Sequence, residues 1–333
     1  MPFSLLKLRS TYKNINRVRQ IINVFLKYGF GHIIDQLRLH RFVSLRKRLK
    51  TFGQWPAVKG HTVPERLRMA FTELGPSFIK LGQLLSSRPD LITAHFADEF
   101  KKLQDEVPPF PSEEAKRIIE EETQLPIDKV FARFQDKPTA AASIAQVHHG
   151  TLLDGSDVII KVQRPDIREQ IETDINILTT IAQLMDKHIP ESRFFNPTGI
   201  VEEFSRTVRK ELDFLEEAKN CLRFRKNFES SPHIYIPKIY SAFSTEKILT
   251  MERIEGVRID DISGIEGMGL DRKELAKNGV DAYFKMVLED GFFHADPHPG
   301  NIFAMSEGQI GFMDFGIVGR VTDEMKETMA NTF

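Results

Sequence analysis

The stretch that decides the fold lies near the C-terminal end and reads His294-Ala295-Asp296-Pro297-His298-Pro299-Gly300-Asn301, with Asp314-Phe315-Gly316 after it. An Asp and an Asn stand five positions apart, and a second Asp follows thirteen positions after the Asn. Carboxylate and amide oxygens are ligands that Mg²⁺ prefers, and Mg²⁺ is usually bound together with substrate phosphates. The stretch therefore predicts a site that handles phosphate groups with a divalent cation.

This spacing is typical of the catalytic loop of protein kinases, where the first Asp faces the attacking hydroxyl. We therefore predict Asp296 as the catalytic base and Asn301 and Asp314 as the Mg²⁺ ligands. His294 is expected to be structural and to pack behind the loop. His298 stands where Ser/Thr kinases usually place a lysine, and small-molecule phosphotransferases share this frame, so that class remains an alternative.

A lysine on a short apolar strand is the second part of the predicted site. The strand covers 158–162 and follows an Asp154-Gly155 hairpin signal. Lys161 on this strand is placed to contact the α- and β-phosphates of a nucleotide. A lysine that merely snorkels at a strand edge is the plainer interpretation, but the ordered partners favour the phosphate contact.

A carboxylate must orient that lysine, and a long acidic helix predicted over about 200–228 supplies four. Asp213 and Glu217 are four positions apart and would share one face of it. A helix over about 166–187 intervenes, so Glu217 lies 56 positions after Lys161, much farther than in ordinary kinases. A merely acidic, solvated helix is the simpler alternative. The candidate carboxylates are Glu211, Asp213, Glu216 and Glu217.

An alanine-rich turn stands where kinases carry a glycine-rich loop. Alanine lets the backbone approach phosphate, but it resists the positive φ that glycine adopts freely, so we expect a stiffer loop. Two residues at the end of the strand predicted over 247–254 are also assigned to the nucleotide. The predicted nucleotide-binding residues are Ala140, Ala141, Ala142, Ser143, Ile144, Ala145, Gln146, Val147, Lys161, Glu252 and Ile254.

Residues 51–134 are predicted to be helical with proline-rich breaks. Gly75-Pro76 starts one helix, because proline suits the first helical turn. Lys80 and Gln83 line one face of this helix, and Gly82 between them indicates close packing. Another face carries Phe78, Leu81 and Leu85.

The N-terminal segment carries most of the positive charge. Residues 1–50 contain twelve Lys or Arg and one acid, Asp35, so they carry about +11, whereas the whole chain carries −1. A basic amphipathic helix is typical of a membrane-surface element, while a solvated helix packed on an acidic domain is an equal alternative. An organellar targeting segment is a third, weaker interpretation. The apolar residues at helical spacing are Ile15, Val18, Ile22 and Phe25.

Composition sets the remaining bounds. The 333 residues, 41% apolar and 28% charged, suit about two globular domains. The single cysteine, Cys221, excludes an intramolecular disulfide and fits a small buried residue in a reducing compartment. No apolar run approaches the roughly 18–20 residues of a membrane-spanning helix.

Together these motifs resemble the UbiB/AarF family of atypical, protein-kinase-like proteins, over about residues 60–320. The resemblance implies that Glu217 pairs with Lys161. It also implies that the helix with Lys80 and Gln83 belongs to an extension that folds over the nucleotide cleft, with Lys80 near Glu211. The four residues Lys80, Gln83, Glu211 and Asp213 would then occlude a peptide substrate. The segments that carry the resemblance are Lys80–Gln83, Ala140–His148, Val158–Pro165, Glu211–Asp213, His294–Asn301 and Asp314–Gly316.

The resemblance further implies ATP or ADP with Mg²⁺ as cofactors and an ATPase or lipid-directed kinase activity that supports ubiquinone biosynthesis. The expected partners are a membrane surface or prenyl-quinone lipids, with quinone-biosynthesis proteins as further candidates and no nucleic acid. The expected location is the cytoplasmic face of a bacterial inner membrane, peripherally associated, or an organellar equivalent. A non-catalytic, nucleotide-gated lipid scaffold remains an alternative.

The expected fold is α+β and protein-kinase-like, with a five-stranded antiparallel N-lobe sheet, a helical C-lobe and an α-helical N-terminal extension. Only seventeen residues follow Gly316, so we expect a C-lobe that is truncated here. The predicted domains are a basic helical segment (1–50), the helical extension (51–134), the N-lobe with inserted helices (135–256) and a partial C-lobe (257–333).

Overall fold

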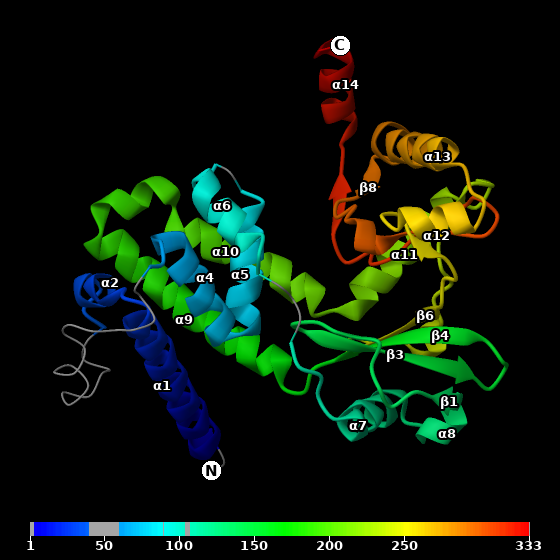
Figure 1. The fold of residues 1–333 in the computed structure, drawn as a ribbon. Coiled ribbons are helices and arrows are strands. Elements are labelled where there is room, and N and C mark those ends of the chain that lie inside the picture. The colour runs from blue at the N-terminus through cyan, green and yellow to red at the C-terminus, as the bar shows by residue number, and fades with distance from the viewer. Residues whose placement is uncertain (1–2, 40–59, 89, 104–106, 333) are drawn as a thin grey trace. The chain divides into compact units, whose positions relative to one another are not determined.

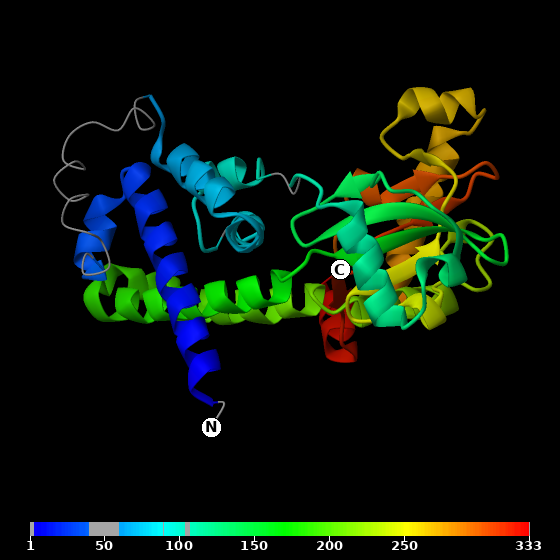
Figure 2. The same ribbon diagram turned by 90° about the horizontal axis from the view of Figure 1, so that it is seen from below.

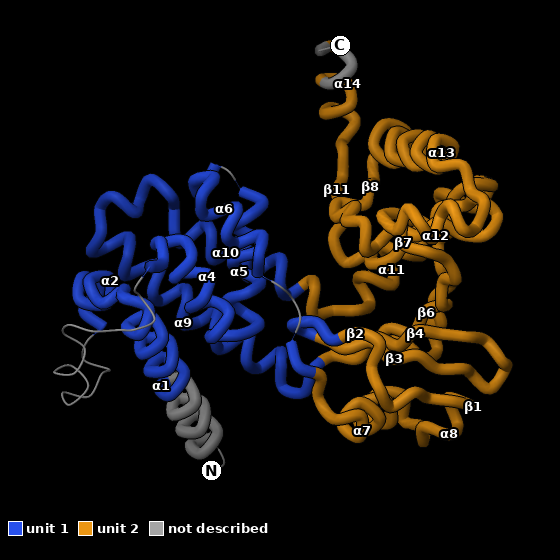
Figure 3. The backbone as a smooth tube through the Cα atoms, viewed as in Figure 1, with its two compact units in different colours: residues 1–108, 141–144, 164–209 blue, residues 109–140, 145–163, 210–333 orange. Residues whose placement is uncertain are grey.

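The computed structural model describes residues 3–39, 60–88, 90–103 and 107–332 (Figure 1). The chain divides into two compact units (Figure 3). Unit 1 comprises residues 1–108, 141–144 and 164–209, and unit 2 comprises residues 109–140, 145–163 and 210–333. Each unit is described by itself.

Unit 1 is helical. Gly75, with a φ of +89°, separates two of its helices, and Pro76 opens the second as expected. A β-carbon added at Gly82 would lie 2.2 Å from Leu103 Cδ1, which confirms the predicted close packing. Its helices are α1 (Phe3–Lys27), α2 (Gly31–Gln36), α4 (Val63–Leu74), α5 (Pro76–Ser86), α6 (Ala94–Phe100), α9 (Ile167–His188), the 3₁₀ helix η3 (Pro190–Phe195) and the start of α10 (Pro197–Glu211).

The apolar face of α1 packs inside unit 1. Figure 2 shows α1 crossing α9, and Val18, Ile22 and Phe25 belong to one cluster with Leu184 and Met185 of α9. This packing favours the packed-helix alternative for the described side chains of α1. Membrane contact through this segment stays a prediction.

A buried carboxylate anchors α1 and α5 to α9. Asp174 is fully buried and accepts hydrogen bonds from Arg17 Nε at 2.7 Å and Arg17 Nη2 at 2.8 Å. Ser77 Oγ donates to the same carboxylate at 2.6 Å. Because charge-assisted, bidentate bonds are the strong ones, this cluster fixes three helices of unit 1.

Unit 2 contains the expected five-stranded sheet, and the prediction is confirmed. The strand order is β1-β3-β4-β6, with β2 paired to β3, and the β1–β3, β3–β4 and β4–β6 pairs are antiparallel. The strands are β1 (Phe131–Phe134), β2 (Ala140–Ala141), β3 (Ala145–Leu152), β4 (Asp157–Gln163) and β6 (Ile248–Glu252).

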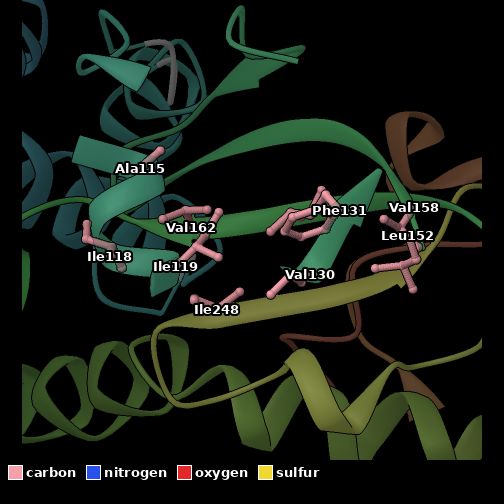
Figure 4. Packing of buried hydrophobic residues seen from close by; sticks show 10 residues of the cluster. Ala115, Ile118, Ile119, Val130, Phe131, Leu152, Val158, Val162 and Ile248 are labelled. Carbon is pink, nitrogen blue, oxygen red and sulfur yellow. The ribbon is translucent and has the colours of Figure 1, made fainter. Parts of the chain in front are cut away.

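Alternation along β4 sets its two faces. Val158, Ile160 and Val162 are fully buried and pack with Ile118 and Ile119 of α7 (Ser112–Thr123) in the cluster shown in Figure 4. Since successive strand side chains point to opposite faces, Lys161 points away from this cluster. Strand geometry thereby places the lysine on the other face of the sheet.

The rest of unit 2 combines short strands and helices. A four-stranded sheet has the order β5-β10-β9-β7, and β8 pairs with β11 antiparallel. The strands are β5 (Ile234–Tyr235), β7 (Val257–Arg258), β8 (Phe292–His294), β9 (Ile302–Ala304), β10 (Ile310–Phe312) and β11 (Val318–Arg320). The helices are α8 (Ile127–Val130), α11 (Phe214–Asn227), η4 (Ser241–Phe243), α12 (Ile262–Gly267), α13 (Arg272–Phe284), the π-turn η5 (Lys285–Glu289), η6 (Pro299–Asn301) and α14 (Asp323–Thr332).

The prediction of a single helix over about 200–228 is wrong, because α10 ends at Glu211 and α11 begins at Phe214. Asp213 has an extended backbone, and its side chain accepts a hydrogen bond from Leu215 N–H. A short side chain that caps the backbone competes with helix continuation. Asp213 and Glu217 therefore do not share a helical face.

Among the described residues, no helix is long and apolar enough to cross a bilayer.

Asp174→Ala should lower the free energy of unfolding by about 3–5 kcal/mol, because it leaves the largely buried, charged guanidinium of Arg17 without a carboxylate partner. The matched control is Glu172→Ala, also on α9, which removes an exposed pair with Arg209. That control should cost about 1 kcal/mol or less. Denaturant unfolding measures both, and equal losses would contradict the anchoring role of Asp174.

Candidate active site

Three charged side chains converge on one point in unit 2. Lys161 Nζ lies 2.6 Å from Glu217 Oε1 and 3.3 Å from Asp314 Oδ2. β4 supplies the lysine, α11 supplies Glu217, and Asp314 follows β10. The side chains of Lys161 and Glu217 are 14% and 8% exposed, whereas that of Asp314 is 49% exposed. The ammonium is thus enclosed, and the second carboxylate faces solvent.

Burial and charge act in opposite directions on this group. Burial raises the pKa of Glu217 to about 6, although Lys161 draws it down. Burial alone would lower the pKa of Lys161, but the carboxylates of Asp314 and Glu217 outweigh it and raise that pKa above its usual value. Lys161 therefore stays a cation at neutral pH.

The Asp-Phe-Gly segment is fixed by α11. Asn220 Nδ2 donates to the Phe315 carbonyl at 2.9 Å. The buried ring of Phe315 packs on Phe224, with ring centroids 5.1 Å apart. Asp314 has a φ of +59°, in the left-handed region that a non-glycine residue visits rarely and often at functional sites. These contacts hold Asp314 with its carboxylate beside Lys161.

His294 joins the segment that contains Asp296 to the segment that contains Asp314. It is fully buried, its Nδ1 accepts the Asp296 N–H at 3.3 Å, and its Nε2 donates to the Met313 carbonyl at 3.0 Å. Tyr283 Oη donates to the carbonyl of His294. The expected structural role of His294 is confirmed.

The predicted catalytic loop is held to Met313, the residue that precedes Asp314. Asn301 Nδ2 donates to the Asp296 carbonyl at 3.4 Å, and Met313 N–H donates to the Asn301 carbonyl at 2.8 Å. Asp296 is exposed. His298 Nδ1 accepts the Gly300 N–H at 3.1 Å, so its ring caps the short turn that follows.

The donor set fits Mg²⁺. Oxygen ligands from one Asp and one Asn suit this ion, which commonly completes its coordination with substrate phosphates and water. The described residues contain no cluster of three His, Cys, Asp or Glu that could enclose a metal. Asn301 and Asp314 are a partial set of oxygen donors of the kind that needs a phosphate-bearing partner, and their role as Mg²⁺ ligands stays a prediction.

The residues of the predicted nucleotide loop differ in their exposure to solvent. Ala140 is exposed, whereas Ala145 is buried and Val147 pairs with Lys161 in the sheet. Gln146 is fully buried and its amide bonds the backbone of Phe110 in both directions, at 3.1 and 3.3 Å. The amide of Gln146 is therefore held by the protein, and its predicted role in nucleotide binding stays a prediction.

Ala141–Ile144 belong to unit 1. Arg164, which was not among the predicted site residues, holds this segment. Arg164 Nε donates to the Ala142 carbonyl at 2.8 Å, and its two Nη groups donate to Pro108 and Val107 carbonyls at 3.0 and 3.2 Å. An arginine directly after the lysine strand was the available signal. The hydroxyl of Ser143 is buried and makes no hydrogen bond within the described residues.

The remaining candidates have local roles. Glu252 accepts the Tyr235 hydroxyl at 2.7 Å and the Lys238 N–H at 3.0 Å, so its carboxylate is held by the protein. Ile254 lies against Gly311, where an added β-carbon would come within 3.1 Å of it.

The four residues predicted to occlude a peptide substrate fall in both units. Gln83 Nε2 donates to the Leu103 carbonyl at 3.2 Å within unit 1, where Lys80 also lies. Glu211 and Asp213 belong to unit 2. The predicted contact of Lys80 with Glu211 stays a prediction.

The antiparallel five-stranded sheet, the Lys161–Glu217 pair and the Asp-Phe-Gly segment define a protein-kinase-like fold. The sequence model of the ABC1 atypical kinase-like domain matches residues 102–333. The chain belongs to this family of atypical kinase-like proteins, the UbiB/AarF family of the sequence resemblance.

Similar proteins agree with this assignment. The chain is 41% identical to the "Probable protein kinase UbiB" of Aliivibrio fischeri, over 96% of this chain and 60% of that protein. The corresponding Vibrio cholerae protein is also 41% identical, over 96% and 59%. The chain thus spans about 60% of the length of these relatives. The complex of Rv3197 with erythromycin from Mycobacterium tuberculosis has a TM-score of 0.55 and 28% identity, covering 77% of this chain and 63% of that one.

Glu217 should give the protein a distinct pH dependence of stability. Its pKa rises from an ordinary 4.5 to about 6 on folding, so the folded state binds the extra proton between these values. The stabilisation from protonated Glu217 is present below pH 4.5 and is lost as the pH rises through about 6, by about 2 kcal/mol. Denaturant unfolding of wild type and Glu217→Gln from pH 4 to 8 measures this, and parallel profiles would contradict it.

Arg164→Ala should loosen the alanine-rich loop, since the carbonyls of Ala142, Val107 and Pro108 lose their donor, and a hydrogen bond of this kind typically contributes about 0.5–1.5 kcal/mol net. Faster amide hydrogen exchange over 140–147 is the expected result. Arg164→Lys should restore protection only partly, because an ammonium lacks the fork of a guanidinium. Arg133→Ala, an exposed arginine on β1, is the control, and exchange unchanged in Arg164→Ala would refute the clamp.

Proposed function

We propose that this chain binds Mg-ATP in unit 2 and acts as an atypical kinase or ATPase. The observation that carries the proposal is the convergence of Lys161, Glu217 and Asp314 within hydrogen-bonding and ion-pair distance. The ammonium of Lys161 lies between the buried carboxylate of Glu217 and the solvent-facing carboxylate of Asp314, and this arrangement suits a site that binds phosphate groups. The ammonium is kept charged and oriented, and one carboxylate remains accessible to a metal.

In this proposal each side chain has one task. Lys161 contacts the α- and β-phosphates, and Glu217 keeps it oriented. Asn301 and Asp314 would hold Mg²⁺, which would neutralise phosphate charge when bound. Asp296, exposed and fixed through its backbone to His294 and Asn301, accepts the proton of the attacking hydroxyl or water.

Backbone N–H groups of an alanine-rich loop can approach phosphate closely. Contact of residues 140–147 with the nucleotide phosphates is therefore part of the proposal on sequence grounds alone.

We further propose that this chemistry supports the biosynthesis of ubiquinone or related prenyl-quinone lipids at a membrane surface. The support is the family membership together with 40–41% identity to proteins named as probable UbiB kinases. The positive charge of the N-terminal fifty residues favours attraction to anionic lipid. Peripheral association with a bacterial inner membrane, and contact with other quinone-biosynthesis proteins, are part of this proposal.

Asp314→Asn should lower the rate of ATP turnover by about 10²-fold or more, because the accessible metal-holding carboxylate is lost at a preorganised charged site. Asp128→Asn, an exposed carboxylate on α8, is the control and should leave turnover unchanged. Turnover is measured for both variants with and without vesicles of anionic phospholipid. An unchanged rate in Asp314→Asn would exclude the enzymatic function, and an unchanged response to vesicles would count against the membrane-surface part.

A further inference from the structure

Unit 1 contains an apolar pocket lined by none of the residues predicted to bind the nucleotide. Its volume is about 410 Å³, which lies within the roughly 300–1,000 Å³ typical of pockets for small organic ligands. Helices α4, α5, α6, α9 and α10 all contribute to its walls, together with residues 91–93 and η3. Six of the lining residues are Leu81, Leu85, Phe96, Leu178, Ala182 and Val201.

The chemistry of the walls restricts the ligand. Among the described residues, Thr93 and Ser192 are the polar ones that line the pocket, and no charged side chain does so. Ser192 Oγ already donates to the Ile189 carbonyl at 2.7 Å. A polar group entering here would lose its water without gaining partners, whereas a hydrocarbon group would gain by leaving water. The pocket therefore selects hydrocarbon.

Two exposed aromatic side chains adjoin the pocket. Phe195 lines it and is 46% exposed, and Phe194 beside it is 86% exposed. Their rings contact edge to face, with centroids 5.3 Å apart. Both lie on η3, the turn between α9 and α10. Large exposed aromatics next to an apolar cavity mark an interaction surface, and Phe is one of the residues by which interfacial elements enter the acyl boundary of a bilayer.

We propose that this pocket binds one hydrocarbon chain of a membrane lipid, and that Phe194 and Phe195 contact the bilayer from which the chain comes. Helices α4, α5, α6, α9 and α10 surround the pocket, and its volume of about 410 Å³ has room for a narrow chain but not for the apolar face of a whole helix from a partner protein. The inference rests on the proposed function only for the membrane setting. It names the lipid chemistry that unit 1 recognises.

Binding of a fluorescent fatty acid, cis-parinaric acid, tests the pocket without any nucleotide. Ile200→Trp, which fills the pocket from α10, should weaken binding about tenfold or more. Ile92→Trp is a second, independent variant at the partly exposed 91–93 segment, and it decides the matter if Ile200→Trp does not fold. Leu153→Trp, an exposed leucine on the β3–β4 turn of unit 2, is the matched control and should bind as wild type.

Competition identifies the source of the chain. Oleate and farnesol are each titrated against bound cis-parinaric acid, and preferential displacement by one identifies an acyl or an isoprenoid chain. Phe194→Ser should keep the wild-type affinity for the dissolved fatty acid while its cosedimentation with phosphatidylglycerol vesicles falls several-fold. Unchanged vesicle binding in Phe194→Ser would refute the bilayer contact.

Three results would overturn the pocket assignment: no binding by wild type, equal binding by a folded Trp variant, or a concentration-dependent dimer that covers the pocket and excludes the probe. The last would show that a second copy of this chain is the occupant. None of these readouts depends on ATP turnover. Failure of this inference and failure of the proposed kinase or ATPase activity are therefore distinguishable.

Discussion

The ion pair between Lys161 and Glu217 is the interaction on which the organisation of unit 2 depends. Removing both charges from water carries a penalty that mutual attraction offsets only with good geometry and further hydrogen bonds. Here the 2.6 Å contact is joined by Asp314 at 3.3 Å, so the ammonium has two carboxylate partners. A buried pair of this kind is weak evidence for stability, since an apolar replacement of similar volume is often as stable. The pair is better explained by its effect on Lys161, because Glu217 keeps the charged ammonium at one place on the sheet.

One face of α11 arranges the rest of this site. Glu217, Asn220 and Phe224 follow each other at intervals of three and four, which brings them onto one side of a helix. They contact Lys161, the Phe315 carbonyl and the Phe315 ring in turn. Because Asp213 ends the preceding helix and caps this one, the rotation of α11 about its axis is set at its first turn. A change at the cap would therefore displace all three contacts together.

Much of this arrangement could be predicted from the sequence, and the reasons for the failures are local. The lysine strand, its hairpin turn and the catalytic segments follow from alternation and from motif spacing. The break at Asp213 was missed because apolar residues continue at helical intervals through it, and the capping geometry that ends α10 is visible only in three dimensions. The roles of Gln146 and Arg164 were missed for a related reason. Both bond backbone groups distant in sequence, at Phe110 and at Val107 and Pro108, and no pattern within their own segments reveals such partners.

The helix α5 links the sequence signature of the family to the apolar pocket. It carries Lys80 and Gln83, and it also supplies Leu81 and Leu85 to the pocket wall. Gly82 lets α5 pack closely, because any larger residue would meet Leu103 and Phe71, so α5 and its neighbours have little room to adjust independently. A chain bound in the pocket would contact the helix that positions Lys80. A ligand shifts a conformational equilibrium only if it binds the two conformations with different affinity. A hydrocarbon chain in the pocket would therefore change the position of Lys80 only if α5 has two positions and the pocket differs between them. Because α5 is tightly packed at Gly82, single side chains there lack the space to move alone. Two such positions would therefore differ by a displacement of the whole helix.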